Sequence, residues 1–304
     1  MEPNEDRLTK LPDNIVHNIL ELSCLPIFDL VELGFSSRRW NHLLITMPYL
    51  DIRTNLSYSL HPVGIPFNHA FIENITRFIT RLLIRQGQSR LVRFSLLSRT
   101  LDFDSVQILM WLCLVAGRYV QELDIEFHPS RDFRLPLCVA VNDSLIVLRI
   151  ALVDKVLQLL SVVRLNRLRS LELYEVAFAD SDLLQRLFSG CPALESLSLK
   201  DCVAGRFSFL DFSSTYLKEL IFDFHHDEID DFSNFVIKVS CPNLVFFQYS
   251  APIAMRYILE DVYSLKTAFI GVSVWLAEVF LDHSLTVGLS VSRVKDVQVK
   301  CFKC

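Results

Sequence analysis

The sequence predicts an α+β fold in which a short helical module precedes an α/β solenoid. Two observations carry this prediction. Apolar residues recur at helical spacing near the start of the chain, between residues 6 and 51. From residue 91 onward the pattern L-x-x-L-x-L recurs nine times, at intervals of 21 to 29 residues. We therefore expect a three-helix module at 6–51, a linker with a helix at 52–90 and a horseshoe of leucine-rich repeats at 91–304.

The composition is that of a globular protein with a large core. Of 304 residues, 51% are apolar and 21% are charged, and the formal net charge is -5. This acidic balance does not favour a nucleic-acid or membrane-surface partner. The first ten residues are polar and acidic, unlike a secretory signal, and the longest apolar runs are too short to span a bilayer. We expect a protein of the nucleus or the cytoplasm, whose cysteines stay reduced thiols.

The first predicted helix lies between two Leu-Pro pairs. Asp13 can cap it, and its apolar stripe consists of Ile15, Val16, Ile19 and Leu20. A module of about 45 residues buries only a thin core. We therefore expect some of these apolar side chains to serve an interface with another protein.

Two further helices complete the module. Pro26 can be the first residue of the second helix, and either Ser36 or Ser37 can cap the third. The third helix carries apolar residues at positions i, i+3, i+4 and i+7, namely Trp40, Leu43, Leu44 and Met47.

The repeat predicts a parallel sheet. The alternating L-x-L half of each unit is a short strand with one buried face, and stacked units bury one continuous core. Residues 181–190 predict a helical return segment, because four apolar residues share one helix face there and Gly190 follows them. Cys202 falls where this kind of repeat commonly carries Asn or Cys, and we expect it to be a buried loop residue.

One row of residues is expected on the concave face of the solenoid. In each unit it is the residue between the last two apolar positions, and Tyr174, Lys200 and Asp223 are expected to flank the row two residues further on. The row mixes charged and apolar side chains, which favours a protein target. The candidate target-binding residues are Arg149, Glu172, Tyr174, Lys200, Asp223 and Gln248.

No motif predicts catalysis. The sequence has no Gly-rich phosphate loop and no G-x-S-x-G nucleophile elbow. The cluster HHDEIDD at 225–231 could hold a divalent metal, although a solvated loop explains it better. Cys301 and Cys304 form a single C-x-x-C pair, which is only half of a zinc site. We expect a chain that is not an enzyme and that has no catalytic residue, cofactor or metal.

The segment DRLTKLPDNIVHNILELSCLP, together with SSRRW further on, resembles the F-box of plant F-box/leucine-rich-repeat proteins. FNHAFIENITRFITRLLIRQ resembles the linker helix of that family, VQILMWLCLVAGRYVQELDI its first repeat, and SGCPALESLSLKDC a family hallmark that CPNLVFFQYS repeats weakly. The positions that match the F-box pattern are Asp6, Arg7, Leu8, Leu11, Pro12, Asp13, Ile15, Val16, Ile19, Leu20, Leu25, Pro26, Arg39 and Trp40.

This resemblance implies the substrate-recognition subunit of an SCF-type (Skp–cullin–F-box) E3 ubiquitin ligase. The F-box would dock on a Skp-type adaptor, and the repeats would hold a target protein for ubiquitination. The chain itself would form no covalent bond. The adaptor-binding residues that the resemblance implies are Leu8, Leu11, Pro12, Ile15, Ile19, Leu20, Leu25, Pro26 and Trp40.

The sequence departs from the family pattern in places. Ile27 and Phe28 replace a Thr-Lys pair, Leu33 and Gly34 replace a Thr-Ser pair, and Ser36 takes a Leu position. An alternative function is therefore a leucine-rich-repeat interaction scaffold whose degenerate F-box engages no ligase. A third hypothesis, small-molecule sensing, has no support beyond the fold. The sequence stops soon after Val299, so we expect it to lack the full C-terminal FBD domain that many relatives carry.

Overall fold

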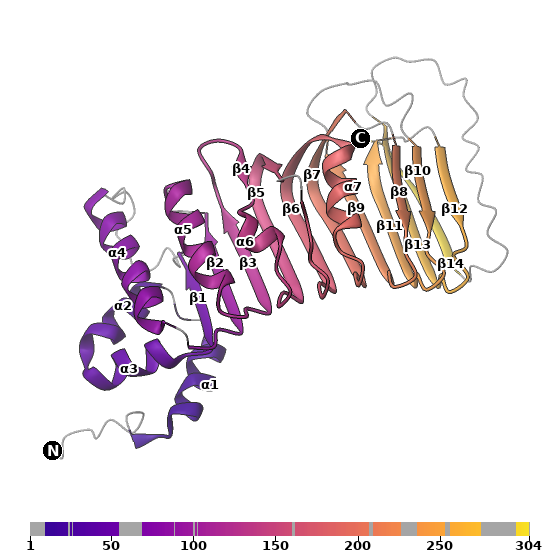
Figure 1. Ribbon diagram of the computed structural model, residues 1–304. Helices are drawn as coiled ribbons and strands as arrows, with labels where there is room; N and C mark the ends of the chain where they lie inside the picture. The colour runs from indigo at the N-terminus through magenta and orange to yellow at the C-terminus, as the bar shows by residue number, and fades with distance from the viewer. Residues whose placement is uncertain are drawn as a thin grey trace. The chain divides into compact units, whose positions relative to one another are not determined.

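The computed structural model has a mixed α/β fold whose strands pair in parallel (Figure 1). This confirms the predicted mixture of helices with a parallel sheet. The structure describes residues 10–23, 25, 27–54, 69–87, 89–99, 101, 103–159, 162–206, 209–225, 236–252, 256–274 and 296–303. The chain divides into two units, Met1–Ser130 and Arg131–Cys304. The finer division at 6–51, 52–90 and 91–304 stays a prediction.

The first unit contains five helices among its described residues: α1 at Asp13–Ser23, α2 at Ile27–Ser36, α3 at Arg38–Thr46, α4 at His69–Gln86 and α5 at Ser105–Ala116. Of the two serines predicted to cap the third helix, Ser37 does so, and its side chain accepts a hydrogen bond from the backbone nitrogen of Trp40 at 3.2 Å. Asp104 caps α5 in the same way. Within the described part of the chain, no helix is long and apolar enough to cross a bilayer.

The described part of the first unit also has three parallel strands: β1 at Tyr49–Arg53, β2 at Arg93–Ser98 and β3 at Glu122–Phe127. The repeat pattern predicts β2 and β3, and both form. The short strand β1 was not predicted, because residues 49–53 cross the boundary between the predicted helical module at 6–51 and the linker at 52–90. Its alternating burial, with Leu50 and Ile52 inside, is the strand signal that the helical assignment overlooked.

The second unit is built on a parallel sheet of seven strands among its described residues, and its order follows the sequence: β5 at Val147–Gln158, β6 at Ser170–Asp180, β7 at Ser196–Arg206, β9 at Glu219–His225, β11 at Phe246–Pro252, β13 at Thr267–Val274 and β14 at Asp296–Lys303. The short β4, Phe133–Arg134, pairs with β5. Each of these seven strands contains the L-x-L half of one predicted repeat, so the predicted register places the strands correctly.

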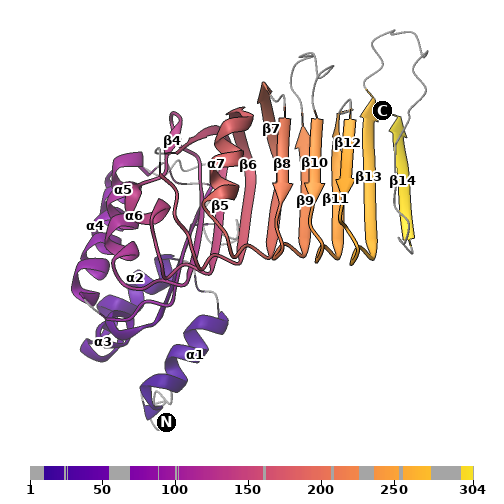
Figure 2. The ribbon, with the colours of Figure 1, turned by 45° about the vertical axis from the view of Figure 1, so that its right-hand side comes forward.

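The return segments differ from one repeat to the next. Helices α6, Leu137–Ala140, and α7, Ser181–Ser189, return the chain in two repeats, and α7 is the predicted helical return. Three later repeats return through strands, β8 at Phe209–Ser213, β10 at Val236–Ser240 and β12 at Arg256–Glu260, which form a second parallel sheet. Figure 2 shows this second sheet beside β9, β11 and β13.

Aromatic rings fill the space between the two sheets. The ring centre of Phe212, on β8, lies 5.0 Å from that of Phe222, on β9, and 5.1 Å from that of Phe188, on α7. All three side chains are buried. Large flat side chains can bridge two sheets where no helix supplies bulk, so these rings fix the spacing of the core.

Candidate protein-docking surfaces

Helix α1 is apolar on two sides. Val16 and Leu20 are buried against the rest of the first unit. Ile15, Ile19 and Leu22 follow one another at i, i+4 and i+7, and they are 41%, 39% and 83% exposed. We call these three residues the α1 stripe. An exposed apolar row on an otherwise well-anchored helix is typical of a protein-docking surface.

Polar contacts with the rest of the unit anchor the opposite side of α1. Arg39, at the start of α3, donates from Nη2 to the carbonyl of Leu11 and to Oδ1 of Asp13 at 3.3 Å. His17 Nε2 lies 3.0 Å from the carbonyl oxygen of Leu43, to which it donates in the matching tautomer.

Glu21, near the end of the helix, completes the anchor. Its Oε1 lies 3.0 Å from Nη2 of Arg93, on β2. The contacts thus run from the first turn of α1 to its last, so the helix is held along its length while the α1 stripe faces outward.

The first turn of α1 explains why a Leu-Pro-Asp triplet goes with a later Arg-Trp pair. The carbonyl of Pro12 accepts hydrogen bonds from the backbone nitrogens of Ile15 and Val16, at 3.0 and 3.2 Å, and so opens the helix. Asp13 is the first helical residue rather than the cap, and its carboxylate pairs with Arg39. Trp40, which follows Arg39, is buried and anchors α3 in the core of the unit. The two parts of the motif therefore fix each other.

The structure separates the predicted adaptor-binding residues into two groups. Pro12, Ile15 and Ile19 are exposed, and Leu11 and Leu25 are half-buried. Leu20 and Trp40 are each only 8% exposed, so they support the module from inside and offer little surface. Leu8 and Pro26 lie outside the described residues.

Leu22, the most exposed member of the α1 stripe, is not among the predicted adaptor-binding residues. The signal was present, because Leu22 continues the spacing of Ile15 and Ile19 by one helical turn. His17, on the other side of α1, is half-buried and contacts α3. Which side of α1 faces outward follows from how the helix is rotated, which the sequence alone does not fix.

The predicted target-binding row forms a continuous line across the second unit. Arg149 pairs in register with Glu172, Glu172 with Ser198, Ser198 with Ile221, and Ile221 with Gln248. These side chains lie at equivalent positions of five neighbouring strands. Tyr174 and Lys200 form a second, flanking pair in register, and Asp223 is paired with Ser250.

Charges in this row neutralise one another. Glu172 lies between two cations, with Nζ of Lys200 at 3.0 Å from Oε1 and Nε of Arg149 at 3.5 Å from Oε2. Both pairs are part-exposed, and such pairs each contribute at most about 1 kcal/mol of stability. Desolvation, and then the carboxylates of Glu175 and Asp201, raise the pKa of Tyr174, so its hydroxyl stays a neutral donor. A partner therefore meets a mixed polar surface with little net charge in this part of the row.

Buried cysteine side chains form contacts between neighbouring repeats. Cys202 lies within strand β7, not in a loop as predicted, and its side chain is fully buried. Its Sγ lies 3.5 Å from the carbonyl oxygen of Leu173 in the preceding repeat. Cys241 makes the same kind of contact, at 3.2 Å, to the carbonyl of Phe212. Burial raises the pKa of Cys191 and Cys202 to about 12, and that of Cys241 to about 11, so these thiols stay protonated and unreactive.

The raised thiol pKa values predict that the second unit loses stability in alkali. Cys202 keeps its proton to about pH 12 in the folded chain, but loses it above its ordinary value of 9.0 when unfolded. The stabilisation is therefore complete below pH 9 and is lost between pH 9 and 12. We expect Cys202→Ala to reduce the fall of the unfolding free energy with pH by about 1.4 kcal/mol per pH unit in this range. Cys113→Ala, at an exposed cysteine of α5, is the control. Equal pH slopes for wild type and Cys202→Ala in urea unfolding would contradict the prediction.

Among the described residues, no group of three or more His, Cys, Asp or Glu side chains is arranged to hold a metal ion. The candidate cluster at 225–231 lies outside the described residues except for the backbone of its first residue, and the pair Cys301–Cys304 is described only in part. Neither prediction is tested by the structure.

Comparison with known proteins identifies the repeats. Residues 108–253 match a family model described as FBD-associated F-box protein At5g56370, LRR repeats. This range extends from α5 to β11, so it contains most of the parallel sheet of the second unit.

The chain also resembles curated proteins of Arabidopsis thaliana along most of its length. F-box/LRR-repeat protein At4g14103 is 30% identical over 88% of this chain and 68% of its own length. F-box/LRR-repeat proteins At3g59190 and At3g59210 are 27% and 29% identical, over 91% and 88% of this chain. The chain spans 70% of the first of these two relatives and 54% of the second. By this similarity, the chain belongs to the plant F-box/LRR-repeat protein family.

Proposed function

We propose that this chain is the substrate-recognition subunit of an SCF-type E3 ubiquitin ligase. In this proposal α1, α2 and α3 form the F-box, which docks on a Skp-type adaptor and through it on a cullin-RING ligase. The repeats bind a target protein. The chain performs no chemistry itself and works in the nucleus or the cytoplasm.

The α1 stripe is the observation that carries the proposal. A helix of 11 residues has Val16 and Leu20 inside its own unit and still exposes three large apolar side chains on another side. Exposing such a row to water is unfavourable by roughly 25 cal/mol for each Å² of apolar surface. A partner that covers Ile15, Ile19 and Leu22 removes this cost. The half-buried Leu11 and the exposed Pro12, at the start of the helix, extend the same surface.

Membership of the F-box/LRR-repeat family supports a Skp-type adaptor as the partner of this docking surface. The departures from the family pattern do not reach the α1 stripe. Ser36, in the place of Leu, hydrogen-bonds to the carbonyl of Leu33 at 2.7 Å, and Gly34 is buried within its own unit. These substitutions therefore change the packing of α2 and leave the proposed adaptor surface on α1 intact.

The repeats supply the proposed target site. Arg149, Glu172, Tyr174, Lys200, Asp223 and Gln248 offer donors, acceptors and an aromatic ring along neighbouring strands, and a protein surface can match such a mixture. Holding the target beside the ligase raises its effective concentration at the ubiquitin-transfer site. In this way a chain without catalytic residues can determine which protein is modified.

Co-purification with a Skp-type adaptor tests the proposal. The variant Ile15→Ala/Ile19→Ala/Leu22→Ala removes the α1 stripe, and alanine keeps the helix stable. We expect wild type to retain the adaptor and the variant to bind it about 100-fold more weakly, since each truncation removes buried apolar surface. The control Ile84→Ala/Val106→Ala truncates two side chains that are 60% and 69% exposed on α4 and α5. It should bind like wild type.

Two results would overturn the proposal. If folded wild type does not bind the adaptor, the alternative of a repeat scaffold with a degenerate F-box takes its place. If wild type and the α1-stripe variant bind equally well, the adaptor does not dock on α1. The variant Leu11→Ala/Pro12→Ala, at the start of the helix, is a second and independent test of whether the adaptor binds this surface.

A further inference from the structure

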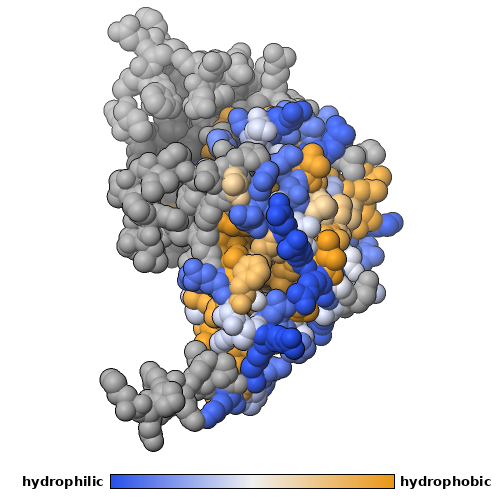
Figure 3. Space-filling view, turned by 90° about the vertical axis from the view of Figure 1, so that its left-hand side faces the viewer, coloured by the Kyte–Doolittle hydropathy of each residue, from blue (hydrophilic) through white to orange (hydrophobic). Residues whose placement is uncertain are grey.

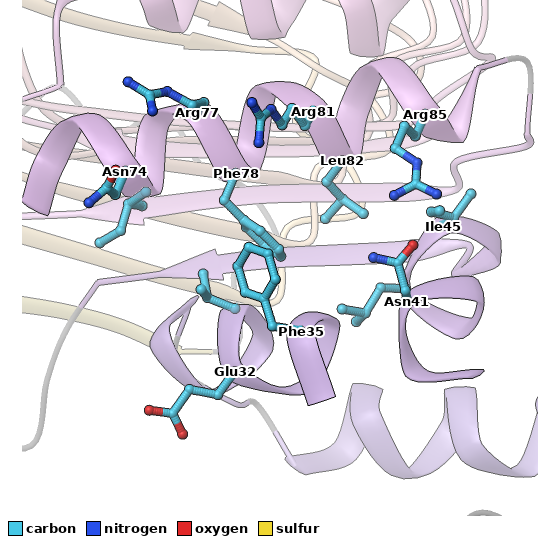
Figure 4. Close-up of a pocket in the computed structure, with 13 residues that line it drawn as sticks. Glu32, Phe35, Asn41, Ile45, Asn74, Arg77, Phe78, Arg81, Leu82 and Arg85 are labelled. Atoms are coloured by element: carbon cyan, nitrogen blue, oxygen red, sulfur yellow. The ribbon is translucent and has the colours of Figure 1, made fainter. Parts of the chain in front are cut away.

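The first unit has a groove that the proposed adaptor surface does not include. It is a hollow of about 540 Å³ between α4 on one side and α2 and α3 on the other (Figure 4). None of the α1-stripe residues lines it. Figure 3 shows the face of the molecule that carries these helices, where apolar side chains gather between hydrophilic ones.

The floor and one rim of the groove are apolar. Leu44 and Leu82 are buried beneath it. Phe35, on α2, is 76% exposed, and its ring centre lies 6.1 Å from that of Phe78, on α4. The two rings point toward each other across the groove in Figure 4. Phe35 is thus exposed and Phe78 half-buried above an apolar floor, and aromatic side chains are enriched in protein interfaces.

The close approach of the helices depends on Gly34. A methyl group at this position would lie 3.2 Å from the side chains of both Leu44 and Phe78. Gly34 thus lies where α2 packs tightly against the side chains of α3 and α4, and Phe35 follows it beside Phe78.

The other rim is a row of arginines. Arg77, Arg81 and Arg85 follow one another at i, i+4 and i+8 on α4, so they stand on one face of the helix over about 12 Å. All three are exposed, and none has a hydrogen-bond or ion-pair partner among the described residues. The carboxylate that lines the groove is that of Glu32, and it points away from the hollow in Figure 4.

This concentration of positive charge is unusual for the chain, whose net charge is -5. Three like charges on one helix face repel one another and so destabilise the helix slightly. Negative groups placed opposite them would remove this repulsion and gain attraction.

We propose that the groove binds an acidic amphipathic helix of a partner protein. Carboxylates of that helix pair with Arg77, Arg81 and Arg85, and apolar side chains next to them pack on Phe35 and Phe78. The arginines recur every four residues, which is the spacing of side chains on one face of a helix. A helix with acidic residues at i, i+4 and i+8 therefore matches the row along its whole length.

The apolar floor favours a protein helix over a small anion. Inorganic phosphate or a similar polyanion would pair with the arginines but would leave Phe35 and Phe78 in water. An amphipathic helix uses both features, because its apolar side chains fall within one helical turn of its charged ones. The inference does not depend on adaptor docking at the α1 stripe, which lies outside the groove.

The test uses the full chain and a designed helical peptide as the probe. The peptide carries Glu at i, i+4 and i+8, Leu at i+3 and i+7, and a fluorescent label. Binding is measured by fluorescence anisotropy at low salt. We expect a Kd on the order of 10–100 μM for wild type, and about tenfold weaker binding at high salt.

Charge reversal identifies the site. Arg81→Glu/Arg85→Glu should weaken binding of the Glu peptide at least about tenfold, and should bind a matched peptide with Lys in place of Glu more tightly than wild type does. Phe35→Ser should weaken the Glu peptide by a similar factor. Arg90→Glu makes the same kind of charge change at an exposed residue outside the groove and should leave binding within about twofold of wild type.

These binding measurements test the groove proposal independently of the proposal that the adaptor docks on α1. No binding of the Glu peptide at about 1 mM, or equal binding by wild type and Arg81→Glu/Arg85→Glu, overturns it. Competition by inorganic phosphate together with no effect of Phe35→Ser also overturns it, in favour of a small-anion site. The α1-stripe variant should bind the Glu peptide like wild type, so a failure of adaptor docking would leave this result standing.

Discussion

Arg118→Ala is expected to lower the unfolding free energy of the first unit by about 3 kcal/mol. Arg118 is 6% exposed, and its guanidinium donates to the side-chain oxygen of Gln86 at 3.0 Å and to the carbonyl of Leu83. Burial lowers its pKa. The side-chain nitrogen of Gln86 in turn donates to the carbonyl of Leu44 at 3.1 Å. One arginine therefore joins the end of α5 to α4 and, through Gln86, to α3.

The size of this effect follows from what the substitution leaves behind. Alanine removes the donors of two buried acceptors, and each buried acceptor without a donor costs about 1–3 kcal/mol. Water does not easily replace the guanidinium, because Gln86 is itself only 3% exposed. The loss of the buried aliphatic stem adds to the cost.

Urea unfolding followed by tryptophan fluorescence measures the effect, since Trp40 and Trp111 both lie buried in this unit. Arg118→Lys should be intermediate, because one ammonium can reach only part of the network. Arg90→Ala, at an exposed arginine of the same unit, should stay within about 0.5 kcal/mol of wild type. A loss below 1 kcal/mol for Arg118→Ala would mean that water or another donor satisfies Gln86 and Leu83.

The parallel sheet could be predicted from the sequence because its signal is periodic. In each repeat the apolar residues alternate over the strand, as at Leu171 and Leu173 of β6 or Leu197 and Leu199 of β7, and all of these are buried. Since one buried face forces one register, the pattern determines which residues lie opposite one another.

The return segments were harder to predict, because each belongs to a single repeat. The sequence predicts one helical return, at residues 181–190, and this is α7. The later returns β8 and β10 instead carry alternating buried residues, Leu210 and Phe212 in one and Ile237 and Val239 in the other. In each of these two strands, buried residues alternate with more exposed ones over five residues only. A pattern of that length becomes decisive only when a neighbouring strand of the same kind pairs with it.

The docking surfaces show a different limit of sequence reasoning. An apolar stripe that includes Ile15, Val16, Ile19 and Leu20 is wide enough to serve two sides of α1, and the pattern does not say which side faces the core. That choice depends on Arg39 and Arg93, which reach α1 from elsewhere in the unit, and on His17 of α1 itself, whose ring contacts α3. The spacing of the arginines on α4 is visible in the sequence, but the aromatic pair opposite them comes from another helix. Sequence patterns thus identify the apolar and charged faces of a helix, and tertiary contacts determine which face is buried and which is left exposed to a partner.

Gly190→Ala is expected to destabilise the second unit by about 3 kcal/mol, although it adds a single methyl group. Sequence analysis assigned this glycine to the end of a helix, and α7 does end at Ser189. The backbone there needs no left-handed conformation. The constraint is one of space, because the added carbon atom would lie 2.7 Å from the backbone oxygen of Val163 and 2.6 Å from its Cγ1.

Two backbone hydrogen bonds hold Gly190 in its position. Its nitrogen donates to the carbonyl of Arg186 at 3.0 Å, and its own carbonyl accepts from the nitrogen of Leu165 at 2.8 Å. Relief of the overlap must break one of these bonds or displace the segment at Val163, which accounts for an expected cost near the upper end for a small-to-large change. Gly117→Ala is the matched control, since Gly117 also follows a helix and its added carbon would meet the nearest atom at an ordinary 3.9 Å. Urea unfolding followed by circular dichroism should show a large loss for Gly190→Ala and little change for Gly117→Ala. Similar values for the two variants would mean that the cost comes from leaving the helix end and not from the contact with Val163.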